Sequence, residues 1–183
     1  MLNILSSKLK KCNLCPAMVA SRFEVMGQDH APCSFVGNNN AKYMFVGIAP
    51  GRLKTKSNKN PQAFKHGSGR ILRKIIEDFS IDINDVFITN ILKCNTPKNN
   101  KFQDNDIKNC TTNFLLKEIN YINPEKIIVL GKDAENKFKK YVTSSQKFSN
   151  IHYVWHPASV LYGKKYSDYK KQFEVIFNKG KHE

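Results

Sequence analysis

Cysteines carry the most distinctive chemistry of this chain. Cys12 and Cys15 form a CxxC pair, a spacing that lets two thiolates converge on one centre, and Cys94 and Cys110 follow as a widely separated pair. Four thiolates can hold either a structural zinc or a [4Fe–4S] cluster. Zinc is the commoner metal, but a zinc ribbon usually repeats its CxxC, and Cys94 and Cys110 could instead be buried small hydrophobic residues. Cys33 is left over and is expected to be an ordinary loop or packed thiol.

Alternating strands and helices must position these residues. Short apolar runs rich in β-branched and aromatic residues are typical of strands buried on both faces. Such runs occupy residues 42–47, 85–90, 126–131 and 151–156. Helical spacing of apolar residues predicts helices at 69–79, after Asp104 as an N-cap, at 132–141 and at 166–177. This alternation predicts an α/β fold with a parallel, layered sheet.

Basic residues outnumber acidic ones two to one, and two irregular segments are rich in lysine. Thirty Lys+Arg against fifteen Asp+Glu give a net charge of +15, which favours a polyanion such as nucleic acid as the partner. A solvated basic surface is the alternative. Loops such as 51–69 and 95–103 tend to lie at strand ends, where ligand sites form. Their lysines are candidate phosphate contacts: Lys54, Lys56, Lys59, Lys65, Lys98 and Lys101.

The length of the chain predicts a single domain over residues 1–183. No run approaches the roughly twenty apolar residues of a membrane span, and the first residues lack the apolar core of a signal peptide. We therefore expect an intracellular monomer that does not bind membranes. Its location would be the cytoplasm or nucleoid, or a nucleus or viral replication site if the source is neither bacterial nor archaeal.

Seven motifs in order resemble the family 4 uracil-DNA glycosylases, which carry a [4Fe–4S] cluster. They run from the CxxCP of residues 12–16 to the His-Pro motif at 156–159 and so cover most of the chain. Between these lie the VGIAPG turn at 46–51, Phe64 ahead of the GRIL helix start at 69–72, TNILKC at 89–94, Cys110, and the strand at 124–131. The resemblance implies that Cys12, Cys15, Cys94 and Cys110 ligate the cluster.

The resemblance also implies a fold and an activity. The fold is a central parallel four-stranded sheet with helices on both faces and a pocket at the strand ends. The activity is hydrolysis of the N-glycosidic bond of uracil in single- or double-stranded DNA, which leaves an abasic site. The nucleotide must be flipped out, because the bond cannot be reached inside a stacked duplex.

Each site residue has a role that suits its side chain. Phe64 would stack on the uracil ring, and Asn90, which can both donate and accept, would read O4 and N3–H. His156 would stabilise the negative charge that develops on uracil O2, so Asn90 and His156 are the candidate catalytic residues. Backbone amides of the glycine turn would supply further donors to the base or a phosphate, from Gly47, Ile48 and Ala49. Without the resemblance, Phe64 would be read as a core residue and Asn90 as a turn or cap residue.

The glycine turn departs from the family pattern. Ile48 stands where the family usually has a glutamate, and no Asp or Glu occurs between Asp29 and Glu77. The usual water-orienting carboxylate is therefore missing from this loop. Two other functions stay open: a non-catalytic or very slow member that binds uracil-containing or single-stranded DNA, and a zinc-stabilised basic scaffold without a base pocket.

Overall fold

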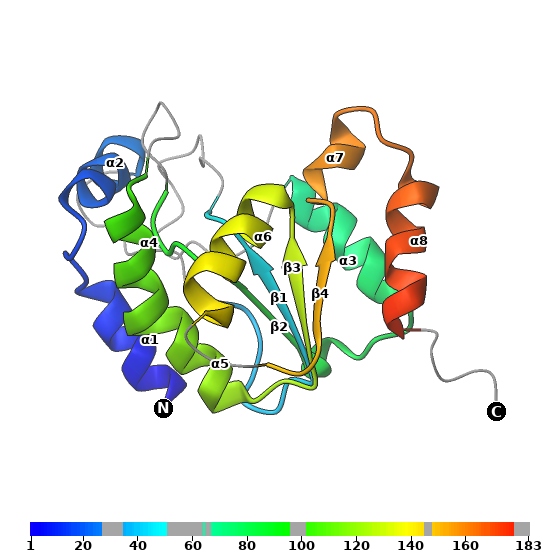
Figure 1. Ribbon diagram of the computed structural model, residues 1–183, viewed down its shortest axis with the longest axis horizontal. Helices are drawn as coiled ribbons and strands as arrows, with labels where there is room; N and C mark the ends of the chain where they lie inside the picture. The colour runs from blue at the N-terminus through cyan, green and yellow to red at the C-terminus, as the bar shows by residue number, and fades with distance from the viewer. Residues whose placement is uncertain (27–34, 51–63, 65–66, 96–101, 145–147, 178–183) are drawn as a thin grey trace.

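Four parallel strands form the centre of the molecule, which confirms the predicted α/β class (Figure 1). The computed structural model describes residues 1–26, 35–50, 64, 67–95, 102–144 and 148–177, with the backbone alone for 22–26. The strands are β1 (Tyr43–Gly47), β2 (Val86–Asn90), β3 (Lys126–Leu130) and β4 (Ile151–Val154). Their order in the sheet is β2-β1-β3-β4, so β1 and β3 are the central strands.

Two helices precede β1 along the chain, and the other described helices lie between the strands or after β4. They are α1 (Leu2–Lys10), α2 (Pro16–Met26), α3 (Ser68–Asp78), α4 (Asp104–Cys110), α5 (Leu116–Ile122), α6 (Lys132–Phe138), α7 (Ala158–Leu161) and α8 (Tyr166–Phe177). A π-helical turn at Thr111–Leu115 joins α4 to α5, and another at Lys139–Thr143 extends α6. None of the described helices is long and apolar enough to cross a membrane.

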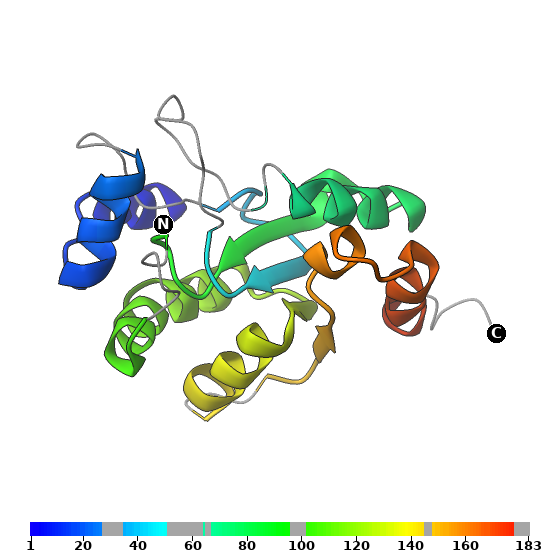
Figure 2. The same cartoon turned by 90° about the horizontal axis from the view of Figure 1, so that it is seen from above.

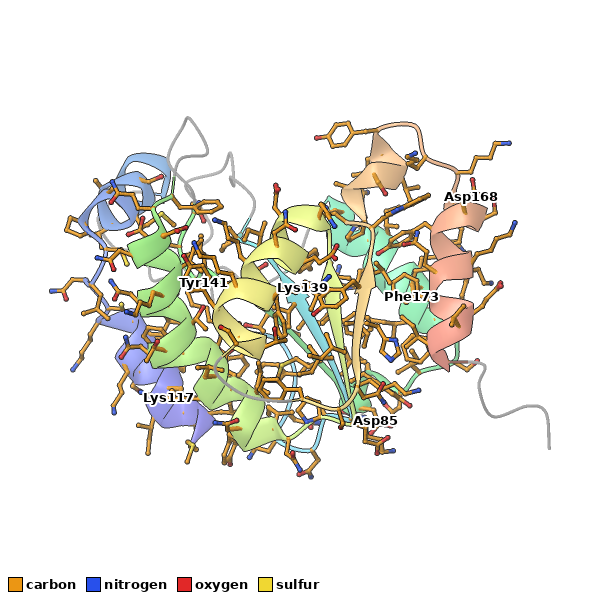
Figure 3. All side chains as sticks on the ribbon, viewed as in Figure 1. Asp85, Lys117, Lys139, Tyr141, Asp168 and Phe173 are labelled. Carbon is orange, nitrogen blue, oxygen red and sulfur yellow. The ribbon has the colours of Figure 1, made fainter. Side chains whose placement is uncertain are left out.

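Alternate side chains of each strand enter two different apolar layers. In β1, Met44 and Val46 pack with residues of α1, α4, α5 and α6, whereas Phe45 packs with α3 and α8. Figure 2 shows α3 on one side of the sheet and α4, α5 and α6 on the other. Phe173 of α8, labelled in Figure 3, is fully buried in the α3 layer. The predicted cover of helices on both faces is therefore confirmed.

The helix predicted after Asp104 has a different N-cap. Gln103 is the cap, and Asp104 is the first helical residue. The Gln103 amide donates to the Asp106 carboxylate at 2.8 Å, which together with the Gln103 side chain forms a capping box. Asp104 instead forms ion pairs with Lys137 and Lys140. The assignment of Asp104 as the cap was wrong by one position, because Gln103 and Asp106 satisfy the first amides of this helix.

Helices α1 and α2 were not predicted, and they carry the CxxC segment between them. Leu2, Leu5 and Leu9 recur at helical spacing on α1 and are all buried in the layer of α4 and α5. Burial of each leucine side chain contributes about 1.5–3 kcal/mol relative to exposure. This packing holds the N-terminal segment beside α4, in the arrangement that Figure 1 shows at its left edge.

Candidate active site and cysteine group

Three of the predicted site residues, Gly47, Asn90 and His156, lie at the carboxyl ends of the strands. Because β1 and β2 are parallel, Gly47 at the end of β1 lies directly beside Asn90 at the end of β2. At the ends of β3 and β4, the Gly131 amide donates to the Val154 carbonyl at 2.8 Å, and His156 follows two residues later. Ligand sites of open α/β sheets form at this edge.

Gly47 leaves room for two side chains at the end of β1. A Cβ at this position would lie 2.5 Å from Asn90 Oδ1 and 2.7 Å from the ring of Phe64. Real Cβ atoms do not approach other atoms this closely, so glycine is what lets both side chains reach the strand end. Gly69 of α3 has a similar role, since a Cβ there would lie 1.7 Å from the Phe64 carbonyl oxygen. The two glycines hold Phe64 between β1 and α3.

Phe64 faces His156 across the site. The two ring centroids are 5.7 Å apart and the ring planes are inclined by 38°. The backbone of Phe64 has a φ of 53°, a left-handed conformation that costs a non-glycine residue about 1–2 kcal/mol. Strain of this kind persists where the surrounding structure holds the residue in place, and it is concentrated at functional sites.

The imidazole of His156 has one nitrogen engaged. Its Nδ1 accepts a hydrogen bond from the Ala158 amide at 3.1 Å, so in the neutral ring the proton is on Nε2. Burial lowers the pKa of His156 below its ordinary value, and the Asp133 carboxylate partly opposes this effect. A Cβ on Gly131, which has a φ of 98°, would lie 2.8 Å from the Cβ of His156. The site therefore presents a neutral imidazole with Nε2–H available as a donor.

Asn90 brings an acceptor to the same place. Its side chain is 3% exposed, and Oδ1 accepts no hydrogen bond within the described part of the chain. A buried amide oxygen without a donor costs about 1–3 kcal/mol. Such an atom, directed at Gly47 and beside an aromatic ring, is the feature expected where a ligand supplies the missing N–H.

Ile48 and Ala49 are half-buried beyond the end of β1. The carbonyl oxygens of Gly47 and Ile48 accept from the amides of Ile91 and Leu92 at 2.8 and 2.9 Å, so the pairing of β1 and β2 continues past the strand ends. The side chains of Ile48 and Ala49 pack against the apolar layer of α4 and α5. This packing explains why an apolar residue is accommodated at position 48.

A buried ion pair beneath Asn90 was not predicted. Lys93 Nζ lies 2.7 Å from Glu118 Oε2, and the two side chains are 1% and 2% exposed. The same ammonium group donates to Thr89 Oγ1 at 2.6 Å and to the Asn90 carbonyl at 2.8 Å. Burial raises the pKa of Glu118, while contact with the Lys93 ammonium group opposes this rise. The only signal in the sequence was a lysine within an otherwise apolar segment that leads to Cys94.

The four cysteines predicted as metal ligands line one small apolar cavity. Cys12 and Cys15 come from the segment between α1 and α2, Cys94 follows β2, and Cys110 ends α4. All four are thiols in the structure. Their apolar neighbours in the cavity wall are Leu14, Met18, Val19 and Leu92.

Burial favours the protonated form of two thiols of this group. Burial is the main cause that raises the pKa of Cys15 to about 11 and that of Cys110 to about 12. Two N–H groups approach the sulfurs, since Asn109 Nδ2 lies 3.7 Å from Cys15 Sγ and the Lys93 amide donates to Cys110. Among the described residues, no three His, Cys, Asp or Glu side chains are arranged to hold a single metal ion.

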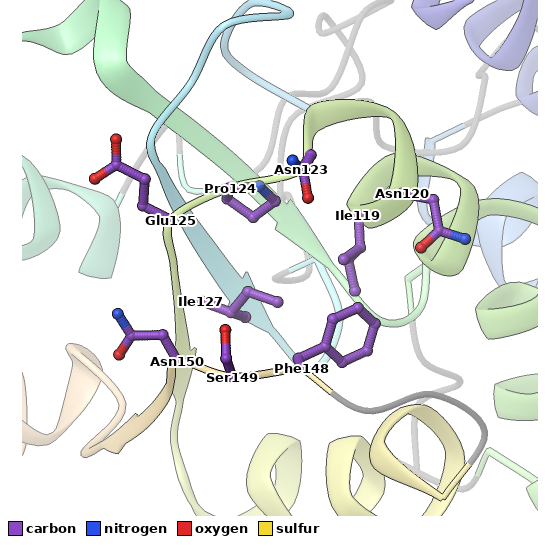
Figure 4. Close-up of a pocket in the computed structure, with 9 residues that line it drawn as sticks. All are labelled: Ile119, Asn120, Asn123, Pro124, Glu125, Ile127, Phe148, Ser149 and Asn150. Carbon is purple, nitrogen blue, oxygen red and sulfur yellow. The ribbon is translucent and has the colours of Figure 1, made fainter.

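A second cavity lies at the amino ends of the strands, on the side of the sheet away from the candidate site. It has a volume of about 440 Å³ and is bordered by the end of α5 and the amino ends of β3 and β4 (Figure 4). Its lining is mainly Asn, Ser and apolar side chains, with Glu125 as an ionisable member. None of the predicted site residues borders it, so the chemistry described above is not located there.

Some predictions fall outside the described residues. These are the packing of Cys33 and the phosphate contacts of the loop lysines Lys54, Lys56, Lys59, Lys65, Lys98 and Lys101.

Leu161, at the end of α7 after the His-Pro motif, is 52% exposed and is therefore not a core residue.

Comparisons with known proteins show the family of the chain. Residues 34–179 match the family model of the uracil DNA glycosylase superfamily. The Type-4 uracil-DNA glycosylase of Thermotoga maritima is 30% identical over 90% of this chain and 78% of its own length. That of Saccharolobus solfataricus is 28% identical, over 88% and 77% of the two chains. The chain belongs to the uracil-DNA glycosylase superfamily, and its place within the superfamily is the type-4 family. The resemblance seen in the sequence motifs is confirmed.

Proposed function

We propose that this protein hydrolyses the N-glycosidic bond of uracil in DNA and leaves an abasic site. The observation that carries the proposal is the convergence of the Phe64 ring and the unpartnered Oδ1 of Asn90 on Gly47, with the neutral imidazole of His156 facing the Phe64 ring. The relatives named above as uracil-DNA glycosylases support the same activity.

Uracil fits the polar groups of the site. Asn90 Oδ1 lacks a donor, and uracil N3–H is a donor where cytosine presents an acceptor. Phe64 would stack on the base, an interaction worth about 1–3 kcal/mol in single-strand binders. Selection for uracil therefore follows from the buried acceptor, because cytosine would leave two acceptors facing each other.

His156 would act on the leaving base. As the glycosidic bond breaks, its electron pair goes to the base and negative charge develops on uracil O2. The Nε2–H of His156 would donate to that oxygen, while the Ala158 amide holds the ring through Nδ1. A water molecule then adds to the sugar carbon and loses a proton, and the departing uracil anion takes up a proton. Without a carboxylate at position 48, stabilisation of the leaving base is the main contribution of the site.

We propose that Cys12, Cys15, Cys94 and Cys110 hold a [4Fe–4S] cluster. The donor set fits, because four thiols surround one apolar cavity and two N–H groups approach the sulfurs. The cavity has a volume of about 10 Å³, so the thiol side chains would have to move apart to admit a cluster. A bound cluster would cross-link the segment between α1 and α2 to α4 and to the residues after β2, which is a structural role.

Iron content tests the cluster. Protein purified without oxygen should contain about four irons per chain and absorb near 400 nm, as expected for this cluster. Cys94→Ser should lower the iron content and the solubility, because ligation joins segments distant in sequence. Cys33→Ser is the control and should keep full iron content. One zinc per chain with no iron would overturn the assignment.

Uracil release tests the activity. The protein should convert a uracil-containing oligonucleotide, single- or double-stranded, into a product that alkali cleaves at the uracil position. The same oligonucleotide with cytosine or thymine should stay intact. If an excess of iron-loaded protein releases no uracil from either substrate, the enzyme proposal fails, and a binding protein for uracil-containing DNA takes its place.

The partner and location follow from the same proposal. DNA is the substrate, and the net charge of +15 favours its phosphates. Action on DNA requires the protein to be in the compartment that holds DNA, and the monomer remains the expected state.

A further inference from the structure

We infer that Lys93 is a positioning residue of the uracil site, which it connects to the cysteine group; this inference rests on the proposed function. Lys93 contacts neither the proposed base position nor solvent, since its side chain is 1% exposed. Its contacts lead instead to Asn90 on one side and to Cys110 on the other.

The ammonium group of Lys93 fixes the end of β2. It donates to the Asn90 carbonyl at 2.8 Å and to Thr89 Oγ1 at 2.6 Å, which are the last two residues of the strand. Asn90 must present Oδ1 beside Gly47, where a Cβ would already be too close. A small rotation of the Asn90 backbone would therefore move the acceptor away from the base position.

The backbone of Lys93 reaches the cysteine group. Its amide donates to Cys110, and the next residue, Cys94, lines the same cavity. Lys93 thus links Cys110 to Asn90 through two hydrogen bonds, one from its backbone amide and one from its side-chain ammonium group. The position of the segment after β2 therefore sets the position of Asn90.

Glu118 supplies the countercharge, and stability alone does not explain the pair. A buried ion pair can often be replaced by apolar residues of similar volume with no loss of stability. Breaking it by removing one partner is strongly destabilising, because a charge is left buried without its counterpart. This difference allows the structural and positioning roles of Lys93 to be separated by experiment.

The test compares Lys93→Met with the double variant Lys93→Met, Glu118→Met. The single variant should unfold at a much lower temperature, and the double variant should regain most of the thermal stability. Both should release uracil about ten- to a hundredfold more slowly than the wild type, the scale expected when a reacting group is misplaced by up to 1 Å. KM for the DNA substrate should change little, because phosphate contacts are untouched.

Two further variants keep the test decisive. Glu118→Gln retains an acceptor for Lys93, so it should lose stability but keep kcat close to wild type. Ile75→Val, in the other apolar layer, is the control for a core change that does not touch the site. Iron content and absorbance near 400 nm should remain unchanged in all soluble variants.

The outcomes distinguish this inference from the proposed function. If the double variant regains both stability and kcat, or if kcat follows melting temperature in every variant, Lys93 has only a structural role and the inference is wrong. If the wild type itself releases no uracil, the proposed function fails, and the inference fails with it.

Discussion

His156→Ala should lower the rate of uracil release by about 10²–10³, the usual effect of removing one preorganised donor. The side chain is the only described imidazole beside Phe64, and its Nδ1 is engaged by the Ala158 amide, so the variant removes the Nε2–H donor and leaves the backbone turn in place. Affinity for undamaged DNA should be nearly unchanged. Single-turnover release of uracil and binding to a uracil-free oligonucleotide measure the two quantities.

The pH dependence of the same residue has a definite sign. Burial lowers the pKa of His156, so the ring should stay neutral at pH values somewhat below the ordinary histidine pKa. The acid limb of the pH–rate profile should therefore lie below that ordinary pKa. The unfolded chain binds the proton more readily than the folded chain. Stability is therefore lost as pH falls from the ordinary histidine value toward the lower folded value, and it is unaffected at higher pH.

His152→Ala is the matched control for this prediction. His152 lies on β4, where its Nε2 is 2.7 Å from Asn150 Oδ1, toward the opposite end of the strand from His156. Its removal should leave the rate and the acid limb unchanged. Equal losses in both variants would contradict the assignment of His156 as the donor to uracil O2.

Gly47→Ala should reduce uracil release by at least about 10²-fold. The added methyl group would lie 2.5 Å from Asn90 Oδ1 and 2.7 Å from the Phe64 ring, so both side chains must move away from the strand end. Displacement of binding groups by 1 Å can cost this much. The measurement is single-turnover release at saturating protein, together with the inhibition constant for free uracil, which should rise.

Val46→Ala is the control for stability at the neighbouring position. Val46 is fully buried and packs in the layer of α4 and α5, away from the proposed pocket. Its truncation should lower the melting temperature and leave the rate of release of the folded protein close to wild type. If Gly47→Ala loses no more activity than Val46→Ala, the glycine is not required for the pocket.

Several features of the fold could be predicted because their signals are local. The four strands follow from runs of apolar residues, and the helices at Ser68–Asp78 and Tyr166–Phe177 follow from helical spacing. The N-cap was predicted at Asp104 and not at Gln103 because three neighbouring polar residues can each cap a helix, and which of them does so depends on the backbone at Gln103. The single domain, the monomer and the roles of the site residues stay predictions.

The sequence by itself determined the family and the order of the strands along the chain, and it supplied the candidate site residues. Tertiary structure alone decided how closely these residues approach one another. The lack of a side chain at Gly47 and Gly131 matters only because Asn90 and His156 pack against these positions. In the same way, Lys93 and Glu118 lie 25 positions apart and became a pair only when α5 packed against the end of β2. Apolar periodicity is a property of neighbours in the chain, whereas a close approach or a buried ion pair depends on how distant segments pack.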